Sequence, residues 1–200
     1  DRGLTVGDGT DYTALGVSGT AGIVYAGTAR PTKTITLTPE YAGAVLTAFY
    51  GAATDTLLTG SITSDAETTV GNLLRTYYQW QRTTDATQHF YTVAVRVSLP
   101  KDFSAWATSN ALTVDYVTSS ATNTVTDLDV RVYLETDLTT VDASSVDQAS
   151  TTWATIGYAG ATLDLWNAAD ETAVIYLRMG SASSGTVRIG SIKLNYLAAF

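Results

Sequence analysis

The chain has 200 residues, a formal net charge of −8 and a sequence pI near 4.4. This length suits one large β domain, and a hydrophobic content of 45% can supply its core. Its Lys and Arg residues stand singly, so no basic stripe follows a phosphate backbone and we expect no nucleic-acid partner. No apolar run approaches the roughly 18 residues of a membrane span, so we expect no membrane span.

Cysteine is absent, which excludes disulfides and thiolate chemistry. Charged residues make up only 15% of the chain, and Thr, Ser, Gly and Ala take their place, so we expect a surface rich in hydroxyls. The chain starts at Asp1 rather than Met, as expected of a trimmed chain or of a mature form that has lost an export signal. These features predict a protein that is extracellular or on the surface of a cell or virion.

Residues 1–30 contain three short strand-like stretches, LTV, YTALGV and GIVYAG, separated by glycines. Together they have too little apolar surface to offset a backbone entropy cost of about 1–2 kcal/mol per residue. They must therefore pack on something else, either as edge strands of their own sandwich or as an N-terminal arm that donates strands to a neighbouring copy. In the second interpretation the residues that fill slots in the neighbour are Leu4, Val6, Leu15, Val17, Ile23, Val24 and Tyr25.

From Pro31 onward, apolar and polar residues alternate with a period of two. YTVAVRVSL, residues 91–99, has an apolar residue at every second position, and LDVRVYLE, residues 128–135, repeats the scheme with Asp129, Arg131 and Glu135 facing outward. Further strands are expected at 33–38, 42–50, 76–82, 111–117, 151–158, 173–179 and 186–197. Alternating strands without crossover helices predict an all-β fold: an antiparallel β-sandwich, jelly-roll-like, over residues 31–200, preceded by the extended N-terminal arm.

The segments that connect these strands carry their own signals. The parity of the apolar residues changes at Gly190, which predicts a β-bulge or bend. GSASSG at 180–185 predicts a hairpin between the last two strands, and the polar stretch 139–150 predicts a loop. Residues 160–171 have weak helical periodicity, which predicts a single helical turn or a strand crossing between sheets.

The sequence offers little catalytic chemistry. His89 is the single histidine, so it cannot form an imidazole-based metal site, and nothing places it in a triad. Glycoside hydrolysis needs only two carboxylates. The candidate pairs are Asp127 with Asp129, Glu135 with Asp137, and Asp170 with Glu171. Since they lie on the outer face of a strand or in turns, with nothing that couples them to a pocket, we expect no enzyme.

Calcium is the one metal that the sequence fits, because its ligands are carboxylates and loop carbonyls. The candidate ligands in acidic stretches are Asp8, Asp11, Asp127 and Asp129, with Asp65 and Glu67 as a further pair. None of these stretches has the spacing of an EF-hand, so solvated acidic turns are the alternative interpretation. We expect no other cofactor.

Four Trp and 12 Tyr residues are the other chemical resource of the chain. Exposed rings on a sandwich can pack against the apolar faces of sugars while neighbouring hydroxyls form hydrogen bonds. The candidate platform residues are Tyr78, Trp80 and Trp106. The alternative is that the rings belong to the core, which we favour for Trp153 and Trp166 because of the area each must bury.

Two stretches, ARPTKTITLTPEYAGAVL (29–46) and VRIGSIKLNYL (187–197), resemble the C-terminal β domains of Gly/Thr-rich bacterial surface-fibre or phage tail-fibre proteins. The resemblance implies a fibrous or adhesive role and names no ligand residue. We therefore expect a structural subunit of an extracellular or virion filament, a homopolymer built by donation of the N-terminal strands. The alternative is a carbohydrate-binding or adhesin module with glycan partners.

Overall fold

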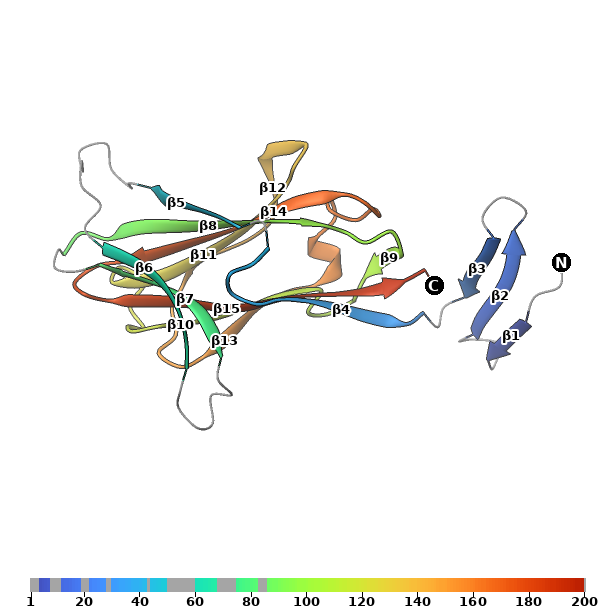
Figure 1. The fold of residues 1–200 in the computed structure, drawn as a ribbon, viewed down its shortest axis with the longest axis horizontal. Coiled ribbons are helices and arrows are strands. Elements are labelled where there is room, and N and C mark those ends of the chain that lie inside the picture. The colour runs from blue at the N-terminus through green and yellow to red at the C-terminus, as the bar shows by residue number, and fades with distance from the viewer. Residues whose placement is uncertain are drawn as a thin grey trace.

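The computed structural model describes residues 4–7, 12–18, 22–27, 30–42, 44–49, 60–67, 75–82 and 86–199 (Figure 1). In these ranges the regular structure is β-strand, apart from one short 3-10 turn, η1 (Gly160–Thr162), and no helix is long and apolar enough to cross a membrane. The strands are β1 (Leu4–Gly7), β2 (Tyr12–Ser18), β3 (Gly22–Gly27), β4 (Thr32–Leu37), β5 (Val45–Phe49), β6 (Gly60–Ala66), β7 (Thr76–Arg82), β8 (His89–Ser98), β9 (Phe103–Trp106), β10 (Leu112–Thr118), β11 (Thr126–Leu134), β12 (Asp137–Gln148), β13 (Ala154–Tyr158), β14 (Thr172–Ser181) and β15 (Thr186–Ala198).

Two antiparallel sheets form the predicted sandwich, which is confirmed as jelly-roll-like (Figure 1). One sheet, here the β15 sheet, has the order β13-β10-β15-β7-β6, with β4 and β9 also paired to β15. The other, here the β14 sheet, has the order β12-β11-β14-β8-β5. Each sheet turns its apolar face toward the other, as strands of period two require.

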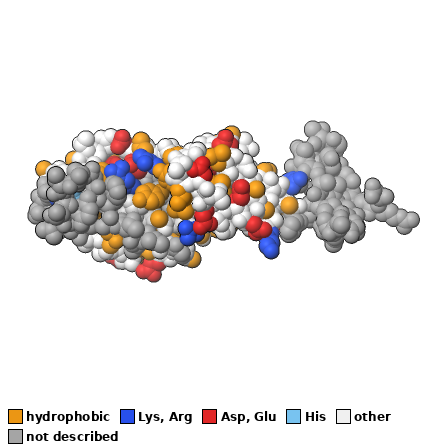
Figure 2. All heavy atoms as spheres, turned by 90° about the horizontal axis from the view of Figure 1, so that it is seen from above, with side chains coloured by type: hydrophobic (Ala, Val, Ile, Leu, Met, Phe, Trp, Pro, Cys, Tyr) orange, Lys and Arg blue, Asp and Glu red, His pale blue; other side chains and the backbone are white. Residues whose placement is uncertain are grey.

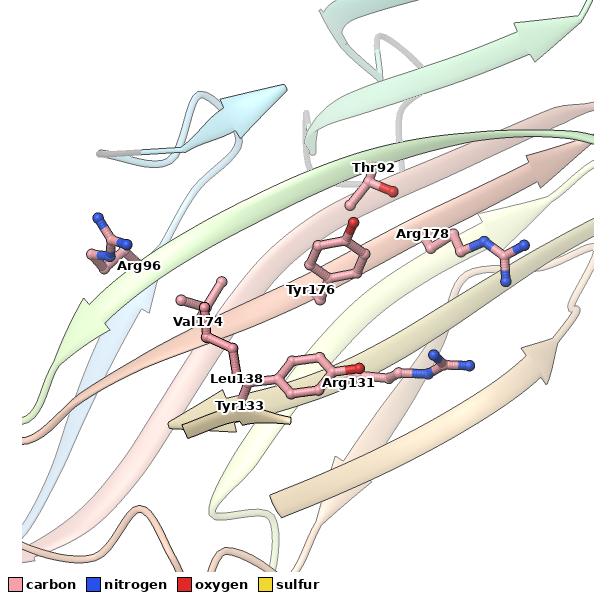
Figure 3. Close-up of a pocket in the computed structure, with 8 residues that line it drawn as sticks. All are labelled: Thr92, Arg96, Arg131, Tyr133, Leu138, Val174, Tyr176 and Arg178. Carbon is pink, nitrogen blue, oxygen red and sulfur yellow. The ribbon is translucent and has the colours of Figure 1, made fainter. Parts of the chain in front are cut away.

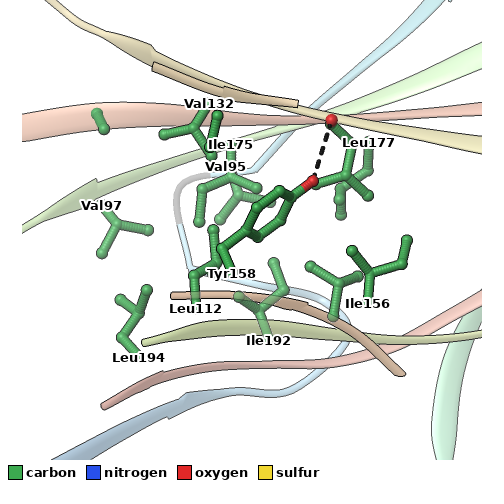
Figure 4. Packing of buried hydrophobic residues seen from close by; sticks show 14 of the residues in the cluster. Val95, Val97, Leu112, Val132, Ile156, Tyr158, Ile175, Leu177, Ile192 and Leu194 are labelled. Carbon is green, nitrogen blue, oxygen red and sulfur yellow. Dashed lines mark hydrogen bonds between the residues drawn. The ribbon is translucent and has the colours of Figure 1, made fainter. Parts of the chain in front are cut away.

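The core lies between the two sheets and contains the inward residues of the alternating strands (Figure 4). Val93 on β8, Val130 on β11 and Leu177 on β14 are fully buried against Leu112 and Ile192 from the β15 sheet. Burial of each such side chain stabilises the fold by about 1.5–3 kcal/mol. The Tyr158 hydroxyl crosses the core and donates a hydrogen bond of 3.3 Å to the carbonyl of Val130, so the layers are also joined by a polar contact.

The β-bulge predicted at Gly190 is confirmed. Val114 pairs with Ile192 and Tyr116 pairs with Ile189, so two residues of β15 oppose one residue of β10. A Cβ on Gly190 would lie 3.1 Å from the Trp153 ring, so glycine lets this ring pack on the bulge.

Two of the predicted connections are wrong. β14 and β15 do not form a hairpin, because they lie in different sheets and the turn at 182–185 carries the chain from one layer to the other. Turn residues such as Ser183 and Ser184, both with positive φ, reverse the chain whether or not the flanking strands pair. The predicted loop at 139–150 belongs mainly to strand β12, whose polar sequence reflects its place at the sheet edge. The single turn expected within 160–171 is present as η1.

Strands β1, β2 and β3 form a separate antiparallel sheet with β2 in the centre. Neither sheet of the sandwich includes them, so the interpretation as edge strands of the sandwich is wrong. The side chains proposed to fill a neighbour lie outside the described part of the chain: Leu4, Val6, Leu15, Val17, Ile23, Val24 and Tyr25. Donation to a second copy and the domain boundary after residue 30 stay predictions.

The bulge at Gly190 allows a test of how much one buried hydrogen bond stabilises the fold. The Tyr41 hydroxyl is buried and donates a hydrogen bond to the carbonyl of Gly190. We expect Tyr41→Phe to lower the free energy of unfolding by about 1–3 kcal/mol, because this carbonyl loses its donor in a buried place. Urea unfolding measures the change. The control is Tyr116→Phe, a buried tyrosine whose hydroxyl has no hydrogen bond among the described residues; equal losses in both variants would contradict the prediction.

Candidate functional site

A groove lies on the outer face of the β14 sheet, the face turned away from the core (Figure 3). The same period of two that turns Val130 and Val132 inward turns Arg131 and Tyr133 outward. The groove has a volume of about 540 Å³. Its lining residues are Thr92, Arg96, Arg131, Tyr133, Leu138, Val174, Tyr176 and Arg178. In the view from above, hydrophobic side chains gather beside charged ones of both signs (Figure 2).

Strand register arranges most of this lining in three rows across β11, β14 and β8, in that order. The rows are Asp129, Arg178 and Thr92; Arg131, Tyr176 and Ala94; and Tyr133, Val174 and Arg96. Neighbouring strands are about 4.8 Å apart, so side chains in one row lie side by side. The rows therefore place aromatic rings beside arginines along the sheet.

Two tyrosines form the aromatic part of the groove. The ring centroids of Tyr133 and Tyr176 are 6.3 Å apart and the ring planes meet at 85°. Both side chains are half-buried, and Leu138 from the edge strand β12 stands exposed beside them. The groove thus offers apolar ring surface together with phenolic hydroxyls.

The three arginines of the groove differ in how firmly they are held. Arg178 donates to Asp129 at 3.0 Å, and its guanidinium carbon lies 3.5 Å from the ring centre of Phe90. Arg131 is 3.8 Å from the same Asp129 carboxylate, beyond hydrogen-bond distance. Arg96 pairs with the exposed Glu135 at 3.0 Å. Arg178 is therefore held by two partners, whereas Arg96 has one exposed ion pair and Arg131 one long ion pair.

Thr92 adds a polar group at the bottom of the groove. Its side chain is fully buried, and its hydroxyl has no hydrogen-bond partner among the described residues. A buried polar atom without a partner costs about 1–3 kcal/mol. Because this hydroxyl has almost no exposed surface, a ligand in the groove could reach it only if the side chain turned.

An acidic cluster lies at one end of the same sheet. One carboxylate oxygen from each of Asp127, Asp129 and Asp147 lies within 4.8 Å of the others. Asp127 and Asp129 are only 2% and 4% exposed. Burial raises the pKa of Asp127 to about 7, and the charges of Asp129 and Asp147 act in the same direction, while Arg178 and a hydrogen bond from Gln88 oppose them. The backbone approaches closely here, since a Cβ on Gly180 would overlap the Asp127 carboxylate.

The structure brings together two of the four predicted calcium ligands, Asp127 and Asp129, and adds Asp147. The other two, Asp8 and Asp11, lie outside the described residues. Carboxylates suit calcium, but Asp129 already accepts hydrogen bonds from Arg178 and from the backbone of Asp147. Calcium binding therefore stays a prediction.

The carboxylate pairs considered for hydrolysis have structural partners. Asp127 and Asp129 are buried and do not line the groove. Hydrogen bonds from Thr139 and Thr140 hold the pKa of Asp137 below its usual range. The Glu171 carboxylate accepts hydrogen bonds from backbone amides in the turn that precedes β14. These contacts give Asp137 and Glu171 structural roles.

The predicted sugar platform is wrong. Tyr78, Trp80 and Trp106 are only 8%, 0% and 7% exposed, because β7 and β9 turn these rings toward the opposite sheet. The Trp80 indole donates to the carbonyl of His89 at 3.1 Å, and that of Trp106 donates to the carbonyl of Trp166. Trp166 belongs to the core, as favoured, whereas the same expectation for Trp153 is wrong: its ring is only half-buried and packs beside Tyr77 outside the core cluster.

Sequence reasoning overlooked Tyr133 and Tyr176, although a signal existed. Tyr133 has the parity of Arg131 in its strand, and Tyr176 has the parity of Arg178. Both tyrosines therefore stand at positions that the alternation assigns to the outer face. An aromatic residue at a position that the alternation assigns to the outer face is therefore a better signal for the groove than the number of aromatic residues in a strand.

Comparisons with known proteins concern the fold. No protein-family model matches the chain, and no curated protein matches it, so the resemblance to fibre proteins has no support at the level of sequence. Among solved structures, a family 11 carbohydrate-binding module from Clostridium thermocellum has a TM-score of 0.47 at 12% identity, over 84% of this chain and 96% of that one. An endo-D glycoside hydrolase domain from Streptococcus pneumoniae has a TM-score of 0.46 at 10% identity, over 76% of this chain. The tailspike protein 4 of bacteriophage CBA120 has the same score and identity, over 78% of this chain. The chain spans 21% and 19% of the length of these last two chains.

The acidic cluster predicts a dependence of stability on pH. Because the folded pKa of Asp127 lies near 7 and the unfolded pKa near about 3.9, the folded state binds this proton more tightly. The stability that Asp127 contributes is thus present below about pH 4 and is lost as the pH rises through 7. We expect Asp127→Asn, which stays neutral, to unfold at a higher temperature than the parent at pH 8 and at nearly the same temperature at pH 4.

The comparison is made by thermal unfolding in EDTA. Asp137→Asn is the control with the opposite sign, because the pKa of Asp137 is lowered and its charge stabilises the fold above about pH 4. A difference between Asp127→Asn and the parent that does not change from pH 4 to pH 8 would contradict the prediction.

The same variant tests calcium. If the cluster binds Ca²⁺, millimolar Ca²⁺ raises the unfolding temperature of the parent at pH 7 by mass action, and Asp127→Asn loses much of this rise. An unfolding temperature of the parent that is the same in Ca²⁺ and in EDTA contradicts the calcium prediction.

Proposed function

We propose that this chain is a carbohydrate-binding module whose ligand lies in the groove over the β14 sheet. The observation that carries the proposal is the convergence of Tyr133 and Tyr176 with hydrogen-bonding side chains on one exposed sheet face. A sugar ring has an apolar C–H face and a rim of hydroxyls, so it needs both kinds of partner in one place. Such a module acts outside the cell or on a surface, where polysaccharides are met.

The polar partners of the proposed ligand come from both sides of the tyrosines. Arg131 on β11 and Arg96 on β8 flank the rings, and the Thr92 hydroxyl lies deeper. An arginine carries several N–H donors, which suit sugar hydroxyls and ring oxygens.

The form of the groove favours a chain of sugars. Its volume of about 540 Å³ lies within the range of roughly 300–1,000 Å³ of small-ligand sites. The lining runs over three neighbouring strands and reaches the edge strand β12 through Leu138. An elongated oligosaccharide can contact this whole length, whereas one monosaccharide meets only part of it.

Filament formation by self-association remains a second candidate. In the three-stranded sheet the central strand is β2, so β1 and β3 each have one edge without a strand partner among the described residues. An open edge is what a strand from another copy would need. Light scattering of the intact chain over a wide range of concentrations tests this candidate, and a mass that stays monomeric contradicts it.

The groove proposal is tested by removal of its rings. We expect Tyr133→Ala and Tyr176→Ala each to weaken binding of an oligosaccharide, first identified on a glycan array, by about 10-fold or more, equivalent to about 1.4 kcal/mol. Titration calorimetry measures the affinity. Leu165→Ala removes an exposed apolar side chain outside the groove and serves as the control. An array without a hit, or a hit that both tyrosine variants bind as tightly as the parent, would contradict the function.

A further inference from the structure

We propose that the groove selects acidic oligosaccharides, whose sugar units carry carboxylates; this inference rests on the proposed function. Three of the chain's 11 cationic residues line the groove, and none of the described residues that line it is Asp or Glu. The chain as a whole has a net charge of −8, so this concentration of arginines is a local property of one face, where Asp129 and Glu135 lie beside them as ion-pair partners. A neutral sugar requires no such concentration.

Arg178 supports the site rather than binding the ligand directly. Its guanidinium donates to Asp129 at 3.0 Å and stacks on the Phe90 ring, and its side chain is mostly buried. These two contacts fix its position. Its charge is matched by that of Asp129, which leaves the selection of an anion to the other two arginines.

Of these two arginines, Arg131 is the better placed to bind an anion. The Asp129 oxygen nearest to it is the one that Arg178 already occupies, and it lies 3.8 Å from Arg131. The other oxygen of Asp129 accepts the backbone N–H of Asp147 at 2.9 Å. Each Asp129 oxygen therefore already accepts a hydrogen bond from another group. The guanidinium of Arg131, on a side chain that is 38% exposed, retains its hydrogen-bond donors for a ligand.

Arg96 lies on the other flank of the groove. Its side chain is 61% exposed, and within the described ranges only its Nε is paired, with the exposed Glu135 at 3.0 Å. An exposed ion pair stabilises a protein by only about 0–1 kcal/mol, so a ligand carboxylate can compete for this guanidinium. A planar guanidinium can also bind a carboxylate through two parallel hydrogen bonds.

The positions of the two arginines indicate the length of the ligand. Arg96 and Arg131 lie two strands and two residues apart in register, roughly 12 Å between Cα atoms from standard sheet spacings. Figure 3 shows their guanidinium groups on different sides of the Tyr176 ring. A ligand that meets both cations and packs on this ring must therefore carry charges on separate sugar units.

A pair of ligands that differ only in charge tests the inference. We expect the intact chain to bind tetragalacturonate at least about 10-fold more tightly than its methyl ester, in which each carboxylate is neutral. The double variant R96Q/R131Q should remove this difference in affinity, whereas Tyr133→Ala should weaken the binding of both ligands. Arg30→Gln removes a cation that is not among the lining residues of the groove and that donates a hydrogen bond to Ser104, and it is the matched control. Titration calorimetry measures all affinities at one salt concentration.

The outcomes separate the inference from the proposed function. Equal affinity for the acid and its ester, or a preference that R96Q/R131Q retains, overturns the inference and leaves sugar binding intact. Tighter binding of a sulfated neutral oligosaccharide than of tetragalacturonate overturns the assignment of carboxylate. Binding of polyglutamate as tightly as tetragalacturonate, unaffected by Tyr133→Ala, overturns both, because charge alone would then explain it. Failure to bind any glycan overturns the function itself.

Discussion

The burial of one face of the β14 sheet is the constraint on which the rest of the structure depends. Val93, Val130 and Leu177 are fully buried in the core, and their neighbours along each strand must face away from it. A slip of one residue in any of these strands would exchange the two faces. The groove residues Arg131 and Tyr176 are thus held in place by core residues that no ligand touches.

A second constraint couples the groove to the acidic cluster. Asp129 is the shared residue, since it binds Arg178, approaches Arg131 and lies beside Asp127. A change in the charge of Asp127 alters the field around Asp129, and through it the balance of the two arginines. Gly180 makes this arrangement possible, because any side chain there would overlap Asp127. Arg131, Arg178 and the three aspartates therefore form one connected network, while Arg96 pairs with Glu135.

The sequence predicted the structural features that depend on alternation within one strand. It did not predict the features that depend on pairing between distant segments. The inner faces of β8 and β11 and the bulge at Gly190 follow from parity, and the structure confirms them. The passage of the chain from β14 to β15 could not be inferred in the same way, because turn residues do not report which sheet the next strand joins. The rings of Trp80 and Trp106 were misplaced for a related reason, since an aromatic-rich strand with ring-bearing residues on both faces does not show which face is buried.

The groove was hard to predict because no continuous motif encodes it. Its rings come from β11 and β14, its cations come from β8, β11 and β14, and one side comes from β12, whose sequence predicted a loop. β12 pairs with β11 through several register shifts, and Leu138 on this strand still reaches the groove. Since β11 pairs with both β12 and β14, the positions of Leu138 and Tyr176 relative to each other are set by two separate strand pairings. A register shift confined to the Leu138 end of β12, before its core residue Ala143, would therefore move Leu138 relative to the rings while leaving the tyrosines in place, which makes this end of β12 the part of the site most open to evolutionary change.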